Sequence, residues 1–182
     1  MKNVVYLYYI FEFGDAAMLK KFYPDYTFKS INDINFSIFT KSKIMWALLD
    51  IDNTLVSYTS PKADDNAKRF LKTLDAIGIK YCFVSNNHKK RVALFAEEFC
   101  CGYVCNSMKP LSFGINRAMR MLGAQRDKTV LIGDQIFTDV YAGNRAGLLT
   151  VMVNPIEAKE TPFFGFKRRM EKIVLRNYEA KK

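Results

Sequence analysis

The sequence predicts an α/β domain in which a doubly wound parallel sheet lies between two layers of helices. Short apolar segments alternate along the chain with segments whose apolar residues recur every three or four positions. This alternation is typical of βαβ units, which join parallel strands through right-handed crossovers. The 182 residues, 49% of them hydrophobic, suffice for one well-buried domain, since domains typically contain roughly 100–150 residues.

The first predicted strand covers residues 44–49, an apolar run that leads directly into Asp50 and Asp52. In parallel α/β sheets, ligands bind just beyond the carboxyl ends of the strands. Alternate residues of an extended segment point the same way, so both carboxylates can reach one pocket. Taken alone, the stretch is equally compatible with an acidic turn that only solvates the end of a strand. The preceding residues 26–40 are too irregular to assign.

Helices and strands then alternate to residue 153. Asp64 or Asp65 is placed to cap the first helix, which Gly78 ends, and Gly123 ends the third. A fourth, short helix ends near Gly143. The segments 81–84, 103–105, 129–132 and 149–153 predict the remaining strands. The apolar positions at helical spacing are Ala67, Phe70, Leu71, Leu74 and Ile77, then Val92, Phe95, Ala96 and Phe99, then Ile115, Ala118, Met119 and Leu122.

The two ends of the chain differ from this central part. We expect residues 1–17 to be a dispensable extension, with Met18 as the natural start, residues 18–155 to form the α/β domain, and residues 156–182 to form a basic amphipathic segment. In that last segment Phe163, Phe166 and Met170 stand among lysines and arginines. The segment is either a final helix packed on the sheet or a helix that lies on an anionic membrane.

The net charge indicates which kinds of partner the protein binds, and the cysteines indicate its cellular compartment. The formal net charge of +10 favours anionic partners such as nucleic acid, acidic lipid surfaces or phosphorylated substrates. No run reaches the roughly 18 apolar residues of a transmembrane helix. The four cysteines lack the C-x-x-C spacing of a zinc site, so we expect reduced thiols in a cytoplasmic protein. Peripheral contact with the inner face of the membrane is a further expectation.

Polar residues follow four successive predicted strands and form a coherent set. They are Asp50 with Asp52, Ser85 with Asn86, Lys109, and Asp134 with Asp139. Carboxylate oxygens are the ligands that Mg²⁺ prefers, and it usually shares them with phosphate oxygens. A lysine beside the metal neutralises charge on a transferring phosphoryl group. The set therefore indicates Mg²⁺-dependent phosphoryl chemistry.

These segments resemble the four motifs of the haloacid dehalogenase (HAD) superfamily, in the same order. The segments are 50–55 (DIDNTL), 84–86 (VSN), 109–110 (KP) and 133–139 (GDQIFTD). Together with residues 143–147 (GNRAG), these segments are most similar in sequence to the YqeG-type HAD-IIIA phosphatases, and the resemblance runs from about residue 18 to about residue 155. It implies a HAD-like three-layer fold and a phosphoric monoester hydrolase.

The resemblance also implies a role for each matched residue. Asp50 is the expected nucleophile, forming an aspartyl-phosphate, and Asp52 the acid that protonates the leaving oxygen and then deprotonates the attacking water. An acid at position 52 points to a phosphatase, because related ATPases carry Thr there. Lys109 is expected to hold Asp50 and the phosphoryl group. The expected substrate-binding residues are Ser85, Asn86 and Thr54, and the expected Mg²⁺ ligands are Asp50, the Asp52 carbonyl, Asp134 and, through water, Asp139.

The spacing between the motifs leaves no room for a cap domain, so the site is expected to be open. Phosphatidylglycerophosphate, on which relatives of the YqeG family act, is then the leading substrate. A soluble sugar phosphate, nucleotide or phosphoprotein is the alternative within the enzyme class. A basic RNA- or ribosome-associated module with vestigial motifs is the alternative of another class, although the sequence contains no RNA-binding motif of a known type, so nucleic acid is not the expected partner. Lys89, Lys90 and Arg91 are expected to form a solvated helix start or to attract an anionic surface.

Overall fold

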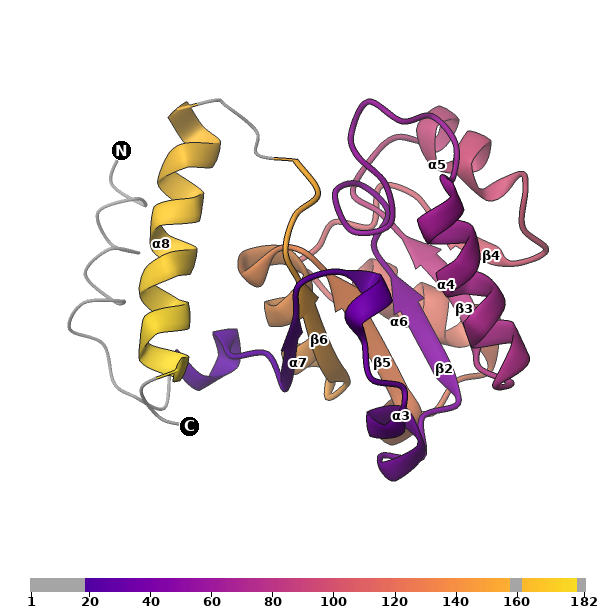
Figure 1. Cartoon of the computed structure of the whole chain (residues 1–182), viewed down its shortest axis with the longest axis horizontal. Helices are drawn as coiled ribbons and strands as arrows, with labels where there is room; N and C mark the ends of the chain where they lie inside the picture. The colour runs from indigo at the N-terminus through magenta and orange to yellow at the C-terminus, as the bar shows by residue number, and fades with distance from the viewer. Residues whose placement is uncertain (1–18, 158–161, 180–182) are drawn as a thin grey trace.

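The computed structural model describes residues 19–157 and 162–179 of the chain. Six parallel strands form one sheet in the order β1-β6-β5-β2-β3-β4 (Figure 1). From β2 the chain winds outward to β3 and β4, and then returns to β5 and β6 on the other side. The sheet is therefore doubly wound, as predicted, with its switch point between β2 and β5. The strands are β1 (Tyr26–Phe28), β2 (Trp46–Leu49), β3 (Lys80–Val84), β4 (Gly102–Val104), β5 (Thr129–Gly133) and β6 (Leu149–Val153).

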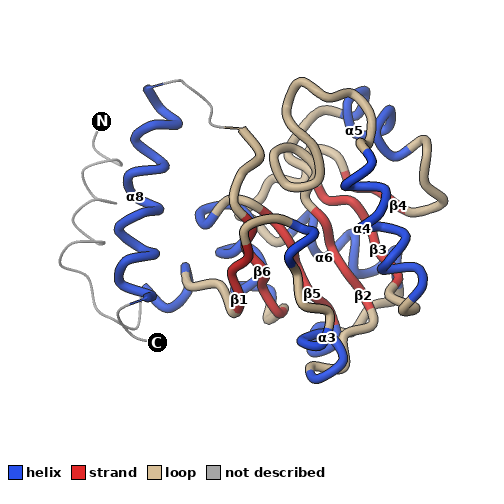
Figure 2. The backbone as a smooth tube through the Cα atoms, viewed as in Figure 1, coloured by secondary structure: helices blue, strands red, loops and turns tan. Residues whose placement is uncertain are grey.

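Helices cover both faces of the sheet, as the tube in Figure 2 shows. Alternate strand residues feed two cores: Leu49 and Phe83 join the core with helices α4 and α5, whereas Leu48 and Val84 join the core with α6 and α7. The helices are α3 (Ser37–Lys41), α4 (Asp65–Ala76), α5 (Lys89–Ala96), α6 (Phe113–Leu122), α7 (Tyr141–Ala146) and α8 (Pro162–Glu179), with single turns η1 (Lys20–Phe22), η2 (Ile31–Asp33), η3 (Arg126–Lys128) and η4 (Ile136–Val140).

Helix boundaries follow the local signals in the sequence. The Asp64 side chain accepts a hydrogen bond from the Ala67 N–H at 2.8 Å and so caps α4. Gly123 follows the last residue of α6 and adopts a left-handed conformation, with φ of 60°, that favours glycine. Predicted and observed strands agree to within two residues at each end. The strand that the sequence did not predict is β1, whose three residues pair with β6.

The connections between the strands hold no inserted domain. A loop and α4 join β2 to β3, and α5 alone joins β3 to β4. The fold is thus a capless α/β domain, as the resemblance to HAD phosphatases implied, and the loops at the carboxyl ends of β2 and β3 leave the site open.

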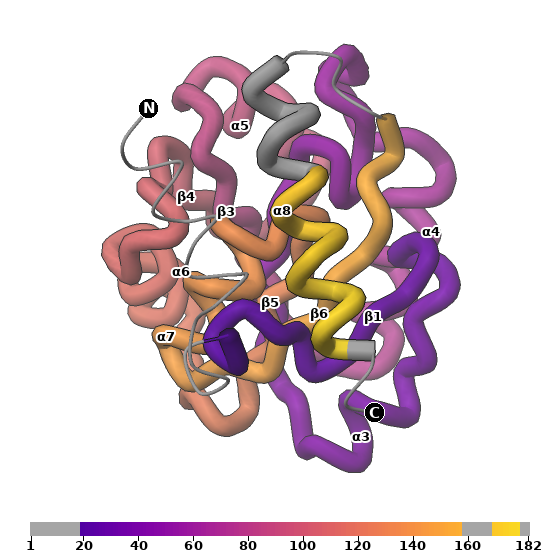
Figure 3. The backbone as a smooth tube through the Cα atoms, turned by 90° about the vertical axis from the view of Figure 1, so that its left-hand side faces the viewer, coloured from indigo at the N-terminus to yellow at the C-terminus, as the bar shows by residue number. Residues whose placement is uncertain are grey.

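Helix α8 lies across the β6 side of the sheet (Figure 3). Met170 and Val174 are buried against a cluster that includes Leu19, Ile136 and Val140. The described side chains therefore show one face of α8 packed on the domain; those of Phe163 and Phe166, like residues 1–17, lie outside the described residues. Among the described helices, none combines the length and apolar character needed to cross a bilayer.

Candidate active site

Strand register brings the predicted motifs to one edge of the sheet. Leu49 of β2 lies opposite Phe83 of β3 and Ile132 of β5, so the three strands end at nearly the same level. The Asp50 N–H continues the ladder by donating to the Ile132 carbonyl at 3.0 Å. A pocket of about 370 Å³ opens at this edge, within the usual range for small-ligand sites. It is lined by Asp50, Asp52, Tyr58, Ser85, Asn86, Asn87, Lys109, Gln135, Thr138 and Asp139.

Lys109 is the central cation of this pocket. Its Nζ lies 2.6 Å from Asp50 Oδ1 and 2.6 Å from Asp139 Oδ1, and it also donates to the Val84 carbonyl at 2.7 Å. All three donor positions of the ammonium are therefore occupied, and its side chain is only 2% exposed. Burial alone would lower the pKa of Lys109, but the charges of Asp139 and Asp50 raise it above its usual value. Lys109 is thus a fixed positive charge between two carboxylates.

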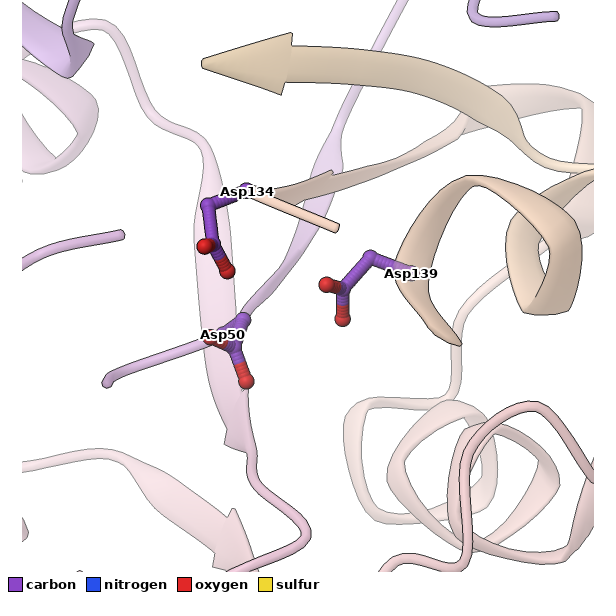
Figure 4. Close-up of side chains that lie close together, drawn as sticks. All are labelled: Asp50, Asp134 and Asp139. Carbon is purple, nitrogen blue, oxygen red and sulfur yellow. The ribbon is translucent and has the colours of Figure 1, made fainter. Parts of the chain in front are cut away.

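The carboxylates of Asp50, Asp134 and Asp139 point toward one another (Figure 4). Each offers an oxygen, and these oxygens all lie within 4.8 Å of one another. All three residues are buried, so their charges repel with little screening from solvent. Burial, with the charges of Asp139 and Asp134, raises the pKa of Asp50 to about 8, although Lys109 opposes that shift. One ammonium does not balance three carboxylates.

This excess of negative charge fits a divalent cation. Hard oxygen ligands from two or more carboxylates, beside a pocket open to a phosphate, are the surroundings in which proteins bind Mg²⁺. Asp50 and Asp134 follow the two strands that flank the switch point, so a cation held between them sits where such sheets bind ligands. Asp139 is engaged differently: Oδ1 binds Lys109, and Oδ2 accepts from the Gln135 N–H at 3.2 Å.

Asp52 lines the same pocket but does not belong to this acidic cluster, and three neighbouring side chains hold its carboxylate. Its Oδ1 lies 3.0 Å from Arg91 Nη2 and accepts from Arg91 Nε at 3.1 Å. Its Oδ2 accepts from the Ser85 hydroxyl and the Asn87 amide, each at 3.3 Å. The prediction of a solvated helix start is therefore wrong for Arg91, whose side chain is 11% exposed, whereas Lys89 and Lys90 are exposed.

The three predicted substrate-binding residues occupy different positions. Ser85 is buried at the floor of the pocket, and Asn86 lines its wall. The Asn86 side chain also clamps the loop that carries Lys109, because it donates to the Lys109 carbonyl at 2.9 Å and accepts from the Lys109 N–H at 2.8 Å. Thr54 is buried, and its hydroxyl donates to Asp50 Oδ2 at 3.2 Å, so it contacts the predicted nucleophile directly.

Two further features of the site depend on contacts that the sequence pattern did not reveal. A Cβ on Gly133 would lie 2.5 Å from Asp139 Cβ, so the close approach of β5 to η4 requires glycine. The buried Glu171 of α8 accepts from the Ile136 N–H at 3.2 Å, at the start of the π-helical turn η4. The C-terminal helix therefore supports the segment that presents Asp139.

Comparison with known proteins places this geometry in a family. A HAD-hydrolase-like family model (Hydrolase_like) matches residues 106–155. The probable phosphatase YqeG of Bacillus subtilis (strain 168) is 35% identical over 159 residues, which cover 87% of this chain and 92% of that protein. The chloroplastic/mitochondrial phosphatidylglycerophosphate phosphatase 1 of Arabidopsis thaliana is 37% identical over 60 residues, which cover 32% of this chain and 17% of that protein.

A solved structure shares the fold. An uncharacterized protein from Listeria monocytogenes serotype 4b superimposes with a TM-score of 0.53 at 16% identity, covering 65% of this chain and 85% of that one. Three observations indicate the same family: the order of the motifs, the buried acidic cluster with its lysine, and the extent of the match to the B. subtilis protein. The chain therefore belongs to the YqeG family of HAD-like phosphatases.

Proposed function

We propose that this phosphatase hydrolyses a phosphomonoester through Asp50, and that its substrate is phosphatidylglycerophosphate. The observation that carries the chemistry is the placement of Lys109 Nζ, 2.6 Å from both Asp50 and Asp139, with Asp52 on the same pocket wall. A buried carboxylate beside a fixed cation and a second carboxyl is the arrangement that covalent phosphoryl transfer requires.

The steps follow from the positions of these side chains. An Asp50 oxygen attacks phosphorus, and the bond from phosphorus to the leaving oxygen breaks as the Asp52 carboxyl transfers its proton to that oxygen. Asp52, now a carboxylate, then takes a proton from the water that attacks the phosphorus of the aspartyl-phosphate. The bond from phosphorus to the Asp50 oxygen breaks, which regenerates the Asp50 carboxylate and releases inorganic phosphate. Thr54 orients the Asp50 carboxylate through its hydrogen bond. The Ser85 hydroxyl, which donates to Asp52, would turn that hydrogen to a phosphoryl oxygen when substrate enters the pocket.

The acidic cluster would hold Mg²⁺ through Asp50, Asp134 and the backbone carbonyl of Asp52. The cation, when bound, supplies charge neutralisation and fixes the orientation of the phosphoryl group. Asp139 holds Lys109 in place, and we assign its contribution to that ion pair or to a water on the metal.

The proposed substrate rests on the openness of the site and on the surface around it. Near Lys109 in the chain, the residues Met108, Leu111 and Phe113 are 57%, 40% and 69% exposed, and we propose that they form an apolar rim to the pocket. An apolar rim beside a phosphate site suits a headgroup presented at a lipid surface, and the net charge of +10 favours an anionic one. The partial match to a phosphatidylglycerophosphate phosphatase points the same way. We therefore propose that the protein works in the cytoplasm, in peripheral contact with the inner face of the membrane.

The test is a phosphate-release assay with Mg²⁺ on phosphatidylglycerophosphate in mixed vesicles and on a panel of soluble sugar phosphates, nucleotides and phosphopeptides. Asp50→Asn should reduce turnover by on the order of 10⁴-fold or more, as loss of a covalent nucleophile does. The control Asp75→Asn makes the same change at an exposed position of α4 and should leave turnover unaltered.

The panel separates the chemistry from the substrate. Efficient turnover of a soluble phosphate with none of the lipid would overturn the lipid substrate, and activity that survives Asp50→Asn would overturn the nucleophile. Co-sedimentation with anionic but not zwitterionic vesicles, reduced by Phe113→Ser, is the expected behaviour of the apolar rim.

A further inference from the structure

Arg91 makes two sets of contacts that join separate parts of the pocket. Its Nε and Nη2 both approach Asp52 Oδ1, at 3.1 and 3.0 Å, while Nη1 donates to the Pro61 carbonyl at 2.9 Å. The guanidinium also lies over the Phe95 ring, 5.8 Å from its centroid. A rigid planar fork can bind two acceptors on different segments at once, which a flexible ammonium does poorly.

The two acceptors have different relations to the site. Asp52 is the proposed proton donor, whereas Pro61 belongs to the loop between Asp52 and α4, which also carries Tyr58 on the pocket wall. Arg91 itself lies in the first turn of α5, the helix that follows the motif at residues 84–86. Arg91 therefore connects helix α5, the loop above the pocket and the carboxyl group of Asp52.

Proton transfer to a leaving oxygen depends on the geometry of the acid, and small displacements are costly. Asp52 Oδ2 receives two long hydrogen bonds of 3.3 Å from Ser85 and Asn87, whereas both shorter contacts come from Arg91. The Arg91 contacts are therefore the stronger restraint on the side-chain torsions of Asp52.

We propose that Arg91 is a positioning residue, which holds Asp52 at the leaving-group side of the pocket and fastens the loop at Pro61 above it. The inference rests on the proposed function, in which Asp52 protonates the leaving oxygen. It predicts that Arg91 matters in proportion to how much the leaving group needs a proton.

The experiment compares two substrates with the full-length protein and Mg²⁺. 4-Nitrophenyl phosphate has a leaving group that departs with little protonation, whereas an alkyl ester such as glycerol phosphate needs the acid. Since general acid catalysis contributes about 10²–10⁴-fold, Arg91→Gln should lower kcat/KM by about 10–100-fold on the alkyl ester and by less than about threefold on the aryl ester. The ratio kcat/KM is the readout because it reports formation of the aspartyl-phosphate, whereas kcat also includes its hydrolysis, which is common to both substrates. Asp52→Asn should show the same selectivity with a larger loss.

Matched variants separate positioning from folding and charge. Arg69→Gln makes the same change at an exposed position of α4 and should leave both substrates unaffected. Arg91→Lys keeps the charge without the fork and should retain the selective loss; with Arg91→Ala, added guanidinium should restore alkyl ester turnover. These two variants carry the test if Arg91→Gln does not fold.

Each outcome decides between the two claims. Equal losses on both substrates would overturn the role of Arg91 while the phosphatase proposal stands. Faster alkyl ester turnover in Arg91→Gln would do the same, because it would mean that the contact with Arg91 hinders Asp52. If Asp52→Asn itself shows no leaving-group selectivity, the assignment of Asp52 fails, and the role of Arg91 fails with it.

Discussion

Replacement of Lys109 by Met should destabilise the protein strongly, and the loss should depend on pH. The substitution removes the ammonium between Asp50 and Asp139 and leaves three buried carboxylates without it. Breaking a buried ion pair by removing one partner costs about 3–5 kcal/mol. For a chain of this size that corresponds to a fall of about 6–20 °C in the melting temperature.

The sign of the pH dependence follows from the raised pKa of Asp50, about 8 against an ordinary value of 3.8. A carboxyl with a raised folded-state pKa adds stability below its unfolded pKa, and this stability is lost as the pH rises through the folded value. Lys109 lowers the pKa of Asp50, so without it the carboxyl resists ionisation still more. The loss of stability in Lys109→Met should therefore be larger near pH 9 than near pH 5, where the ion pair with Asp139 is still lost, and Mg²⁺ should partly reverse it.

The assay is thermal unfolding at about pH 5 and about pH 9, with and without Mg²⁺, followed by the fluorescence of Trp46, the single tryptophan. Lys72→Met, at an exposed position of α4, is the control and should be neutral at both pH values. A loss below 2 °C for Lys109→Met, or a loss of equal size at both pH values, would refute the reasoning from buried charge.

Three other perturbations test separate parts of the structure. Gly133→Ala, whose Cβ would collide with Asp139, should lower the free energy of unfolding by about 1–3 kcal/mol and remove most of the activity. In Gly102→Ala the new Cβ meets only the flexible tip of Met121, so the losses of stability and activity should be small. Equal activity in the two variants would count against the close approach of Gly133 to Asp139. Calorimetric Mg²⁺ affinity should rise by up to about tenfold per pH unit below about pH 8, because a proton on Asp50 competes with the metal, and a pH-independent affinity would exclude Asp50 as a ligand. Met170→Ala should lower the free energy of unfolding in urea by about 2–5 kcal/mol through the cavity beneath α8, while Lys172→Ala on the exposed side should not; equal stabilities would show that α8 is not docked.

Most of the fold could be predicted because its signals are local. Apolar runs and helical spacing indicated five of the six strands and the helices between them, and the polar residues Asp50, Ser85 and Asp134 marked three strand ends. Strand β1 has three residues, too few for their alternation to indicate a strand by itself; it exists because β6 offers a free edge. Its position is a tertiary effect that no short window of sequence contains.

The site residues also fall into two groups, those that local sequence patterns predict and those that only the assembled fold reveals. The positions of the motifs after predicted strands indicated that Asp50, Lys109 and Asp139 lie at one edge of the sheet, and in the structure Lys109 contacts both carboxylates. Arg91 escaped prediction because it ends a basic run, and a local pattern cannot say which member of such a run turns inward. Glu171 escaped because it lies 35 residues from its partner Ile136, on a helix whose position depends on the assembled domain.

The central claim is that Asp50 carries the phosphoryl group. It is tested most directly by a crystal structure of the protein with Mg²⁺ and beryllium trifluoride, a mimic of an aspartyl-phosphate. We predict the trifluoride bonded to a carboxylate oxygen of Asp50, with Lys109 Nζ against a fluorine and the cation between Asp50 and Asp134. A trifluoride bonded to another residue, or an occupied cation site with Asp50 unmodified, would contradict it.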